Sequence, residues 1–154
     1  MNVEFINPFL EALLNVLRTM AAMDAQPGSP EIKKTNISSG DVTGLIGMTS
    51  DLTKGTLAIS FTEAAILEIM QRMLGEAVER IDETVTDMVG EITNMVTGGA
   101  KKILSEKGYH FDMAIPSVVA GKGHVIRHKS KSPIINVPFT TEKGDFFIEV
   151  CFDD

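Results

Sequence analysis

Apolar residues recur every three or four positions in three stretches of the chain, which is the spacing of one face of an α-helix. The first stretch begins at Asn7 and Pro8, a capping residue followed by a residue suited to the first helical position. The other two begin after capping residues and end at glycines. The predicted helices run from Asn7 to about Met23, from Thr62 to Gly75, and from Asp82 to about Glu106, before Gly108.

Strand-like runs occupy the remaining segments, in two blocks. Residues 42–49 and 55–61 flank turn residues at 51–55 and predict a hairpin. A weaker strand is predicted at 31–38, and the Pro- and Gly-containing residues 26–30 predict a turn. After the third helix, strands are predicted at 111–119, 124–127, 134–140 and 146–152.

The order helix, strands, two helices, strands favours an α+β fold with a mainly antiparallel sheet, because the strands come in blocks and do not alternate singly with helices. A length of 154 residues predicts one domain spanning 1–154. The net charge of −7 argues against nucleic acid or an anionic membrane as a partner. One cysteine, Cys151, excludes an internal disulfide and fits a cytoplasmic location. We expect no signal peptide, because the first residues lack a basic segment, and no membrane span, because no apolar run is long enough.

The third predicted helix carries the best candidate site. At about 100° per residue, positions 87, 91, 94 and 98 fall within about 60° of one another. Asp87, Glu91 and Asn94, here called the acid–amide stripe, therefore share one face with Gly98, opposite the apolar side. From spacing alone, a solvated helix face is the better explanation of such a stripe. Asn94 and the pair Gly98–Gly99 are nevertheless poor helix formers placed mid-helix, which favours a surface with a role besides folding.

Other candidates are weaker. The three histidines lack metal-ligand spacing, and the basic residues around His124 and His128 suggest a solvated loop more than an anion site. Glu68 and Gln71 have the same three-residue spacing as Glu91 and Asn94, but a solvated surface is the better interpretation. Cys151 lies on an alternating strand and is expected to be a small core residue.

The acid–amide stripe, with Pro116 about twenty residues later, resembles the signature of the CheC/CheX chemotaxis phosphatases. Three flanking segments strengthen the resemblance over nearly the whole chain: residues 5–12, 63–76 and 115–121. The resemblance implies an α+β fold with helices on one face of the sheet, a homodimer, and hydrolysis of the aspartyl phosphate of a CheY-type response regulator. Relatives of the CheC branch carry a second site on the first helix. Here Glu11 and Asn15 have the wrong spacing for it, so we expect one site.

In this resemblance Glu91 would pair with the regulator's active-site lysine, and Asn94 would orient the attacking water. Asp87 and Gly98 would have supporting roles in the contact with the partner. An amide can both donate to and accept from a water molecule, as the water-positioning glutamine of GTPases does. The protein needs no cofactor of its own, because Mg²⁺ would come with the phosphorylated receiver domain. The alternative is a non-catalytic interaction module related to the flagellar switch proteins.

Overall fold

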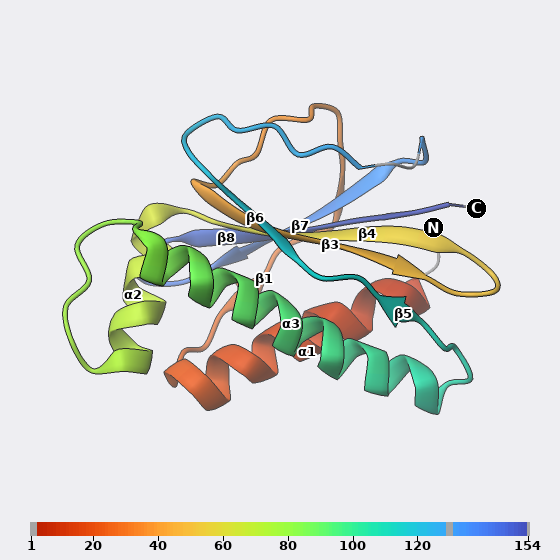
Figure 1. The fold of residues 1–154 in the computed structure, drawn as a ribbon, viewed down its shortest axis with the longest axis horizontal. Coiled ribbons are helices and arrows are strands. Elements are labelled where there is room, and N and C mark those ends of the chain that lie inside the picture. The colour runs from red at the N-terminus through yellow and green to blue at the C-terminus, as the bar shows by residue number, and fades with distance from the viewer. Residues whose placement is uncertain (1–2, 129–130, 154) are drawn as a thin grey trace.

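The computed structural model describes residues 3–128 and 131–153, with three helices and eight strands in the predicted order (Figure 1). The helices are α1 (Val3–Ala21), α2 (Glu63–Leu74) and α3 (Glu83–Glu106). The strands are β1 (Gln26–Pro27), β2 (Glu31–Lys33), β3 (Val42–Thr49), β4 (Lys54–Phe61), β5 (Asp112–Met113), β6 (Ser117–Ala120), β7 (Ile134–Thr140) and β8 (Asp145–Phe152).

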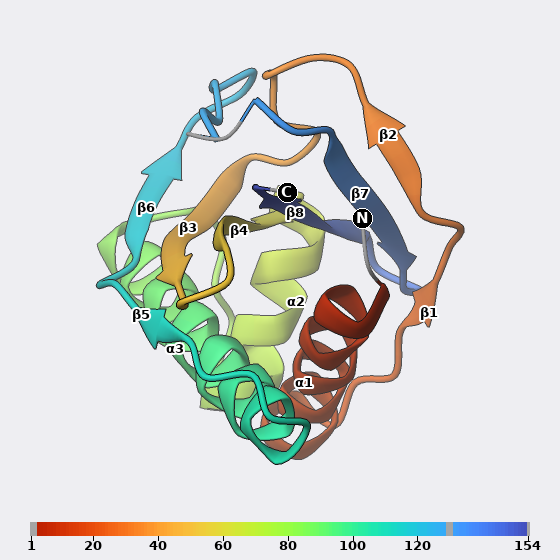
Figure 2. The same cartoon turned by 90° about the vertical axis from the view of Figure 1, so that its right-hand side faces the viewer.

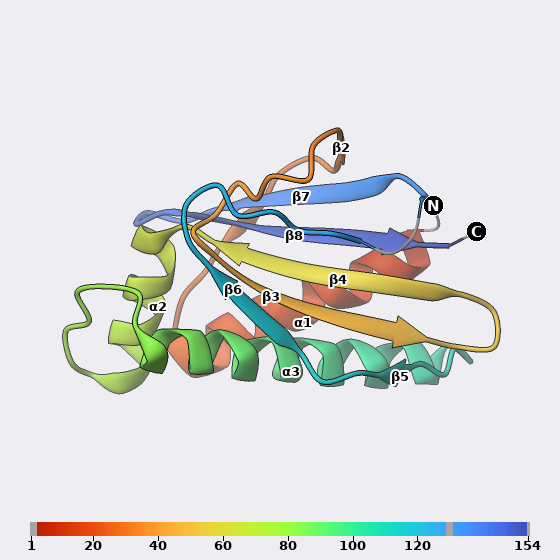
Figure 3. The same ribbon diagram turned by 45° about the horizontal axis from the view of Figure 1, so that its top comes forward.

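All strands belong to one antiparallel sheet, whose central path runs β1-β7-β8-β4-β3-β5. The predicted β3–β4 hairpin pairs in full register, from Val42 with Phe61 to Thr49 with Lys54. The short strands extend the two ends of the sheet: β2 pairs with β7, and β6 pairs with β3 (Figure 3). β6 and β2 are thereby placed at opposite ends of the strand order.

The three helices pack on one face of this sheet, which curves around them so that β5 and β6 flank α3 (Figure 2). Between the layers lies one cluster of buried apolar side chains from all three helices and from β3, β4, β7 and β8. The α+β prediction, with a mainly antiparallel sheet and helices on one face, is confirmed. No helix within residues 3–128 and 131–153 is long and apolar enough to cross a membrane.

Loops cover part of the other face of the sheet (Figure 1). The His124 ring bonds to Thr43 Oγ1 at 2.6 Å and to the Gly121 carbonyl at 2.6 Å. The Thr43 hydroxyl in turn bonds to Ser60 Oγ at 2.8 Å, and both hydroxyls are buried. A chain of polar side chains therefore fastens the segment after β6 to the centre of the sheet.

The second and third helices have the predicted caps. The Thr62 side chain accepts a hydrogen bond from Ala65 N, and Gly75 ends α2 in the left-handed conformation. The Asp82 side chain accepts from Val85 N at 3.1 Å at the start of α3.

The predicted start of the first helix was wrong: α1 begins at Val3, and Pro8 lies inside it. The proline removes one backbone hydrogen bond, but the extra turn is held by tertiary contacts. Ile6 is buried, and the Phe5 ring packs edge-on against Tyr109, with a centroid distance of 4.8 Å, and also contacts Phe152.

Three strand predictions were also corrected. The strand predicted at 111–119 is broken into β5 and β6, because Pro116 has no N–H and holds the residue before it extended. The segment 124–127 makes only an isolated bridge, between Val125 and Ile37. In the N-terminal region the strand predicted at 31–38 is limited to β2, and the predicted turn contains the two-residue β1.

Candidate functional site

The position of α3 is fixed by its buried side and by two close approaches. Val89, Ile92 and Val96 are fully buried against the sheet and the neighbouring helices. A methyl group at Gly44 of β3 would overlap the Thr93 hydroxyl, so the absence of a side chain there lets α3 lie close to the sheet. A Cβ at Gly99 would be 3.2 Å from Ala12 Cβ, which shows how closely α1 approaches α3.

The opposite side of α3 presents the acid–amide stripe to solvent. Asp87, Glu91 and Asn94 are all exposed, as the helical periodicity predicted. The three residues line one wall of an open hollow of about 430 Å³. The other wall comes from the segment between β5 and the end of β6, which runs beside α3 (Figure 2). Its residues are Ile115, Pro116, Val118 and Ala120.

The side chains of the stripe are free to act on a partner. Among residues 3–128 and 131–153, no hydrogen bond or ion pair engages the side chains of Glu91 or Asn94. The Thr93 and Thr97 hydroxyls, by contrast, are satisfied within the helix, since they donate to Val89 O at 2.7 Å and to Thr93 O at 2.9 Å. Glu91 and Asn94 are separated by about 4.5 Å along the helix axis, at 1.5 Å per residue. One carboxylate and one amide can therefore contact neighbouring groups of a single partner.

The glycines of α3 have different explanations. Gly98 faces open space, with nothing within 4 Å of the place a Cβ would occupy, and it is not part of the hollow. Gly99, by contrast, lies where α1 packs closely on α3, so a side chain there would crowd Ala12. Gly90, which the helical pattern did not single out, lines the hollow, and a Cβ there would touch Val118 Cγ2 at 3.5 Å. Of the two unusual mid-helix glycines, only Gly98 is unexplained by packing.

The opposite wall of the hollow was largely missed from sequence. Pro116 stood out by its spacing from the stripe, but Ile115, Val118 and Ala120 had no predicted role in the site. Their place beside α3 depends on the pairing of β6 with β3, for example Val118 with Gly44. A helical pattern gives no information on such a long-range pairing.

The other candidates do not form a second site. Glu68 Oε1 is 3.2 Å from Arg72 Nε within α2, which fits a helix-surface ion pair. Glu11 and Asn15 are exposed on α1. No group of three or more His, Cys, Asp or Glu side chains in the described part of the chain could hold a metal ion. Cys151 is buried, as predicted, but on the sheet face away from the helices, where its thiol donates to the Ser132 carbonyl at 3.3 Å.

The prediction of a solvated loop was wrong for two of its residues. His124 is half-buried and bonds to Thr43 Oγ1 through its ring nitrogen. His128 Nε2 lies 3.2 Å from Glu149 Oε1, and the His128 and Glu149 side chains are both buried. The other Glu149 oxygen accepts a 2.7 Å hydrogen bond from Lys33 Nζ. This buried ion pair joins β2 to β8 across the sheet. No local pattern could indicate it, because its members are over a hundred residues apart.

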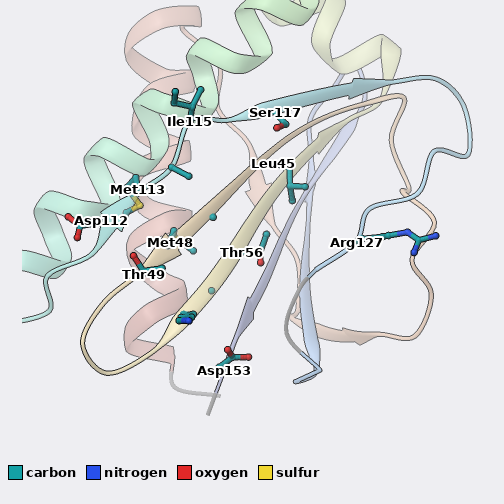
Figure 4. Close-up of a pocket in the computed structure, with 14 residues that line it drawn as sticks. Leu45, Met48, Thr49, Thr56, Asp112, Met113, Ile115, Ser117, Arg127 and Asp153 are labelled. Carbon is teal, nitrogen blue, oxygen red and sulfur yellow. The ribbon is translucent and has the colours of Figure 1, made fainter.

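A larger groove of about 650 Å³, here called the sheet groove, lies on the face away from the helices (Figure 4). It is lined by alternate residues of β3, Leu45, Gly47 and Thr49, and reaches Arg127 and Asp153. Its residues carry no carboxylate–amide pair like that of the stripe. The hollow beside α3 is therefore the better candidate for a functional site.

Comparison with known proteins gives one consistent family. The family model described as "Chemotaxis phosphatase CheX" matches residues 42–140, which include all of α3 and both walls of the hollow. The curated "CheY-P phosphatase CheX" of Thermotoga maritima is 26% identical over 155 residues, covering 97% of each chain. A crystal structure of a CheC-like superfamily protein from Shewanella sp. PV-4 is 61% identical, covers 100% of both chains and has a TM-score of 0.94.

A further solved structure shows the same fold in an assembly. It is a CheX–CheY–BeF3–Mg²⁺ complex from Borrelia burgdorferi, 22% identical to this chain, covering 99% of this chain and 100% of that one, with a TM-score of 0.82. At this identity the similarity concerns the fold.

Proposed function

Because this chain belongs to the CheX family of chemotaxis phosphatases, we propose that it hydrolyses the aspartyl phosphate of a CheY-type response regulator and so ends a two-component signal. The observation that carries the proposal is the pair Glu91 and Asn94, exposed on one wall of an open hollow and engaged by no other described side chain. An enzyme of this kind needs such groups because its substrate is a surface of another folded protein.

The chemical step requires little from this chain. Water attacks phosphorus, the bond between phosphorus and the aspartyl oxygen breaks, and the regulator's carboxylate leaves with the electron pair while the water protons stay with the inorganic phosphate. An acyl phosphate is already activated, so the missing component is a water held in line with the leaving group. We assign that task to Asn94, whose amide can donate to and accept from one water.

Glu91 has a binding role in this proposal. Its carboxylate lies one turn before Asn94, where it would pair with the lysine beside the regulator's phosphoaspartate and fix the orientation of the two proteins. Asp87, a further turn back, would contribute a second negative charge to the same contact. Gly98 lies outside the hollow, so we propose at most a peripheral contact there.

The protein would use no cofactor of its own, and Mg²⁺ would arrive bound to the receiver domain, where it neutralises phosphoryl charge. The hollow itself is poorly suited to holding a metal ion, since its carboxylates, Asp87 and Glu91, lie on one wall only and an apolar wall faces them. The Borrelia burgdorferi complex likewise contains Mg²⁺ together with CheY.

We further propose that residues 1–154 act as one domain, which the single core cluster supports. From the family resemblance we propose a homodimer whose sheets join edge to edge, and a cytoplasmic location. The buried free thiol of Cys151 fits a reducing compartment.

The test is the loss of radiolabelled phosphate from a panel of phosphorylated receiver domains of the same organism, with and without this protein. Acceleration for at least one receiver is the expected result. Saturable binding without faster phosphate release would instead favour a non-catalytic interaction module of the same fold.

A further inference from the structure

Ile115 is the most exposed large hydrophobic residue in residues 5–128 and 131–153, at 90%. Single exposed apolar residues are ordinary on protein surfaces, so exposure alone implies nothing. The location of Ile115 is what distinguishes it. It lines the site hollow beside Glu91 and Asn94, and it also lines the sheet groove (Figure 4). Ile115 therefore stands at the rim that the two depressions share.

The backbone around Ile115 is held on both sides. Ala114 N donates to Gly47 O at 2.9 Å, and Ser117 pairs with Leu45, so only two residues separate two attachments to β3. Pro116 fixes its own φ and keeps the residue before it extended. Ile115 is thus presented to solvent by an ordered segment, and ordering it on binding would require little further loss of conformational freedom.

The two walls of the hollow differ in chemistry. One wall carries the acid–amide stripe, and the facing wall carries the apolar side chains of Ile115, Pro116 and Val118. A protein that brings a phosphoryl group to Asn94 must lay its neighbouring surface across the facing wall. Apolar anchors surrounded by polar contacts are the usual source of affinity in protein interfaces.

We propose that Ile115 is the apolar anchor of the surface that docks the phosphorylated receiver domain. This inference rests on the proposed function. Ile115 lines the same hollow as Glu91 and Asn94, so a receiver domain bound at those residues would also cover Ile115. Ile115 carries no group that acts on the reacting atoms, so it contributes to affinity and leaves the rate of the bound complex unchanged.

The experiment compares Ile115→Ser with Ile32→Ser in the phosphate-release assay. Ile32 is 60% exposed on β2, at the opposite end of the sheet, and provides the same chemical change away from the hollow. Ile115→Ser should raise KM for the phosphorylated receiver about tenfold or more, the loss of an interface anchor. The kcat of both variants should stay within about twofold of the wild type. Ile115→Leu keeps the apolar area and should retain the wild-type KM.

Affinity is measured in parallel for a receiver carrying beryllium fluoride and Mg²⁺, which needs no hydrolysis. Unchanged KM and Kd in Ile115→Ser, with an active wild type, would overturn the anchor and leave the proposed function intact. A wild type that binds the receiver without hydrolysing it would overturn the proposed function, while the Kd comparison still decides the role of Ile115. A changed oligomeric mass with unchanged Kd would assign Ile115 to a contact between copies of this chain, against the proposal.

Discussion

Gly44 of β3 lies directly beneath Thr93 of α3, so closely that a methyl group on Gly44 would overlap the Thr93 hydroxyl. The glycine belongs to the sheet, and the threonine lies one residue before Asn94. The position of the proposed water-orienting amide therefore depends on the absence of a side chain on the strand below. This link between fold and site can be tested by adding one carbon.

Gly44→Ala should lower the free energy of unfolding by about 1–3 kcal/mol, the usual effect of overpacking a tight contact. The double variant Gly44→Ala with Thr93→Ala should recover part of this loss, since it removes the nearest atom. Gly47→Ala is the matched control on the same strand, because nothing lies within 4 Å of the place its Cβ would occupy. Urea unfolding measures all three, and equal stability of Gly44→Ala and Gly47→Ala would contradict the close packing of α3 on β3.

Asn94→Ala should reduce kcat about 100-fold or more, comparable to the loss of a positioned hydrogen-bonding group in other active sites. Its Kd for a beryllium-fluoride-loaded receiver should change little, because the amide acts on water and contributes little to the interface. Asn15→Ala, an exposed asparagine on α1, is the control and should be fully active. Normal turnover by Asn94→Ala would remove the central residue of the proposed mechanism.

Glu91→Ala should weaken receiver binding about tenfold, equivalent to about 1.4 kcal/mol, because it removes the proposed negative partner of the receiver's lysine. The effect should shrink as salt is raised, since exposed charge pairs are screened. Titration calorimetry at two ionic strengths gives both quantities, with Glu11→Ala as the control on α1. An affinity that is insensitive both to salt and to this substitution would show that the carboxylate does not form the contact.

The buried pair of Lys33 and Glu149 gives a prediction about stability alone. Glu149→Gln should destabilise the protein by about 3–5 kcal/mol, because it leaves the Lys33 ammonium without its charge partner inside the protein. Lys33→Met combined with Glu149→Gln should recover much of that loss. A double-mutant cycle on thermal unfolding checks the coupling, and additive effects would show that the two side chains do not depend on each other.

The proposed homodimer is tested by light scattering. At micromolar concentration the expected mass is twice that of the 16.7 kDa chain. A mass of one chain under these conditions would argue against edge-to-edge joining of two sheets.

Local signals predicted α2, α3 and the β3–β4 hairpin well, because caps and turns act over a few residues. Residues Asp82 and Thr62 are examples, since their capping hydrogen bonds span three positions. The start of α1 was predicted wrongly because Pro8 is a local signal and the contacts of Phe5 with Tyr109 and Phe152 are not. Aromatic packing between distant segments outweighed the missing hydrogen bond.

The same limit applies to the site. Helical periodicity was enough to place Asp87, Glu91 and Asn94 on one exposed face. It was not enough to find Ile115 on the wall opposite, because that wall is built by strand pairing between β6 and β3. The sequence also suggested a surface role for Gly99, but this glycine lies where Ala12 of α1 packs closely on α3.

The two sides of α3 have separate roles: Val89, Ile92 and Val96 pack in the core, whereas the side chains of Glu91 and Asn94 make no hydrogen bond or ion pair within the described part of the chain. Substitutions of these two residues can therefore change the proposed activity without disrupting the fold. Under the proposed mechanism, one substitution at Asn94 would leave a well-folded protein that binds the receiver without hydrolysing its phosphate. Relatives that differ at this position would then differ in whether they hydrolyse or only bind the phosphorylated receiver, while they share the same fold.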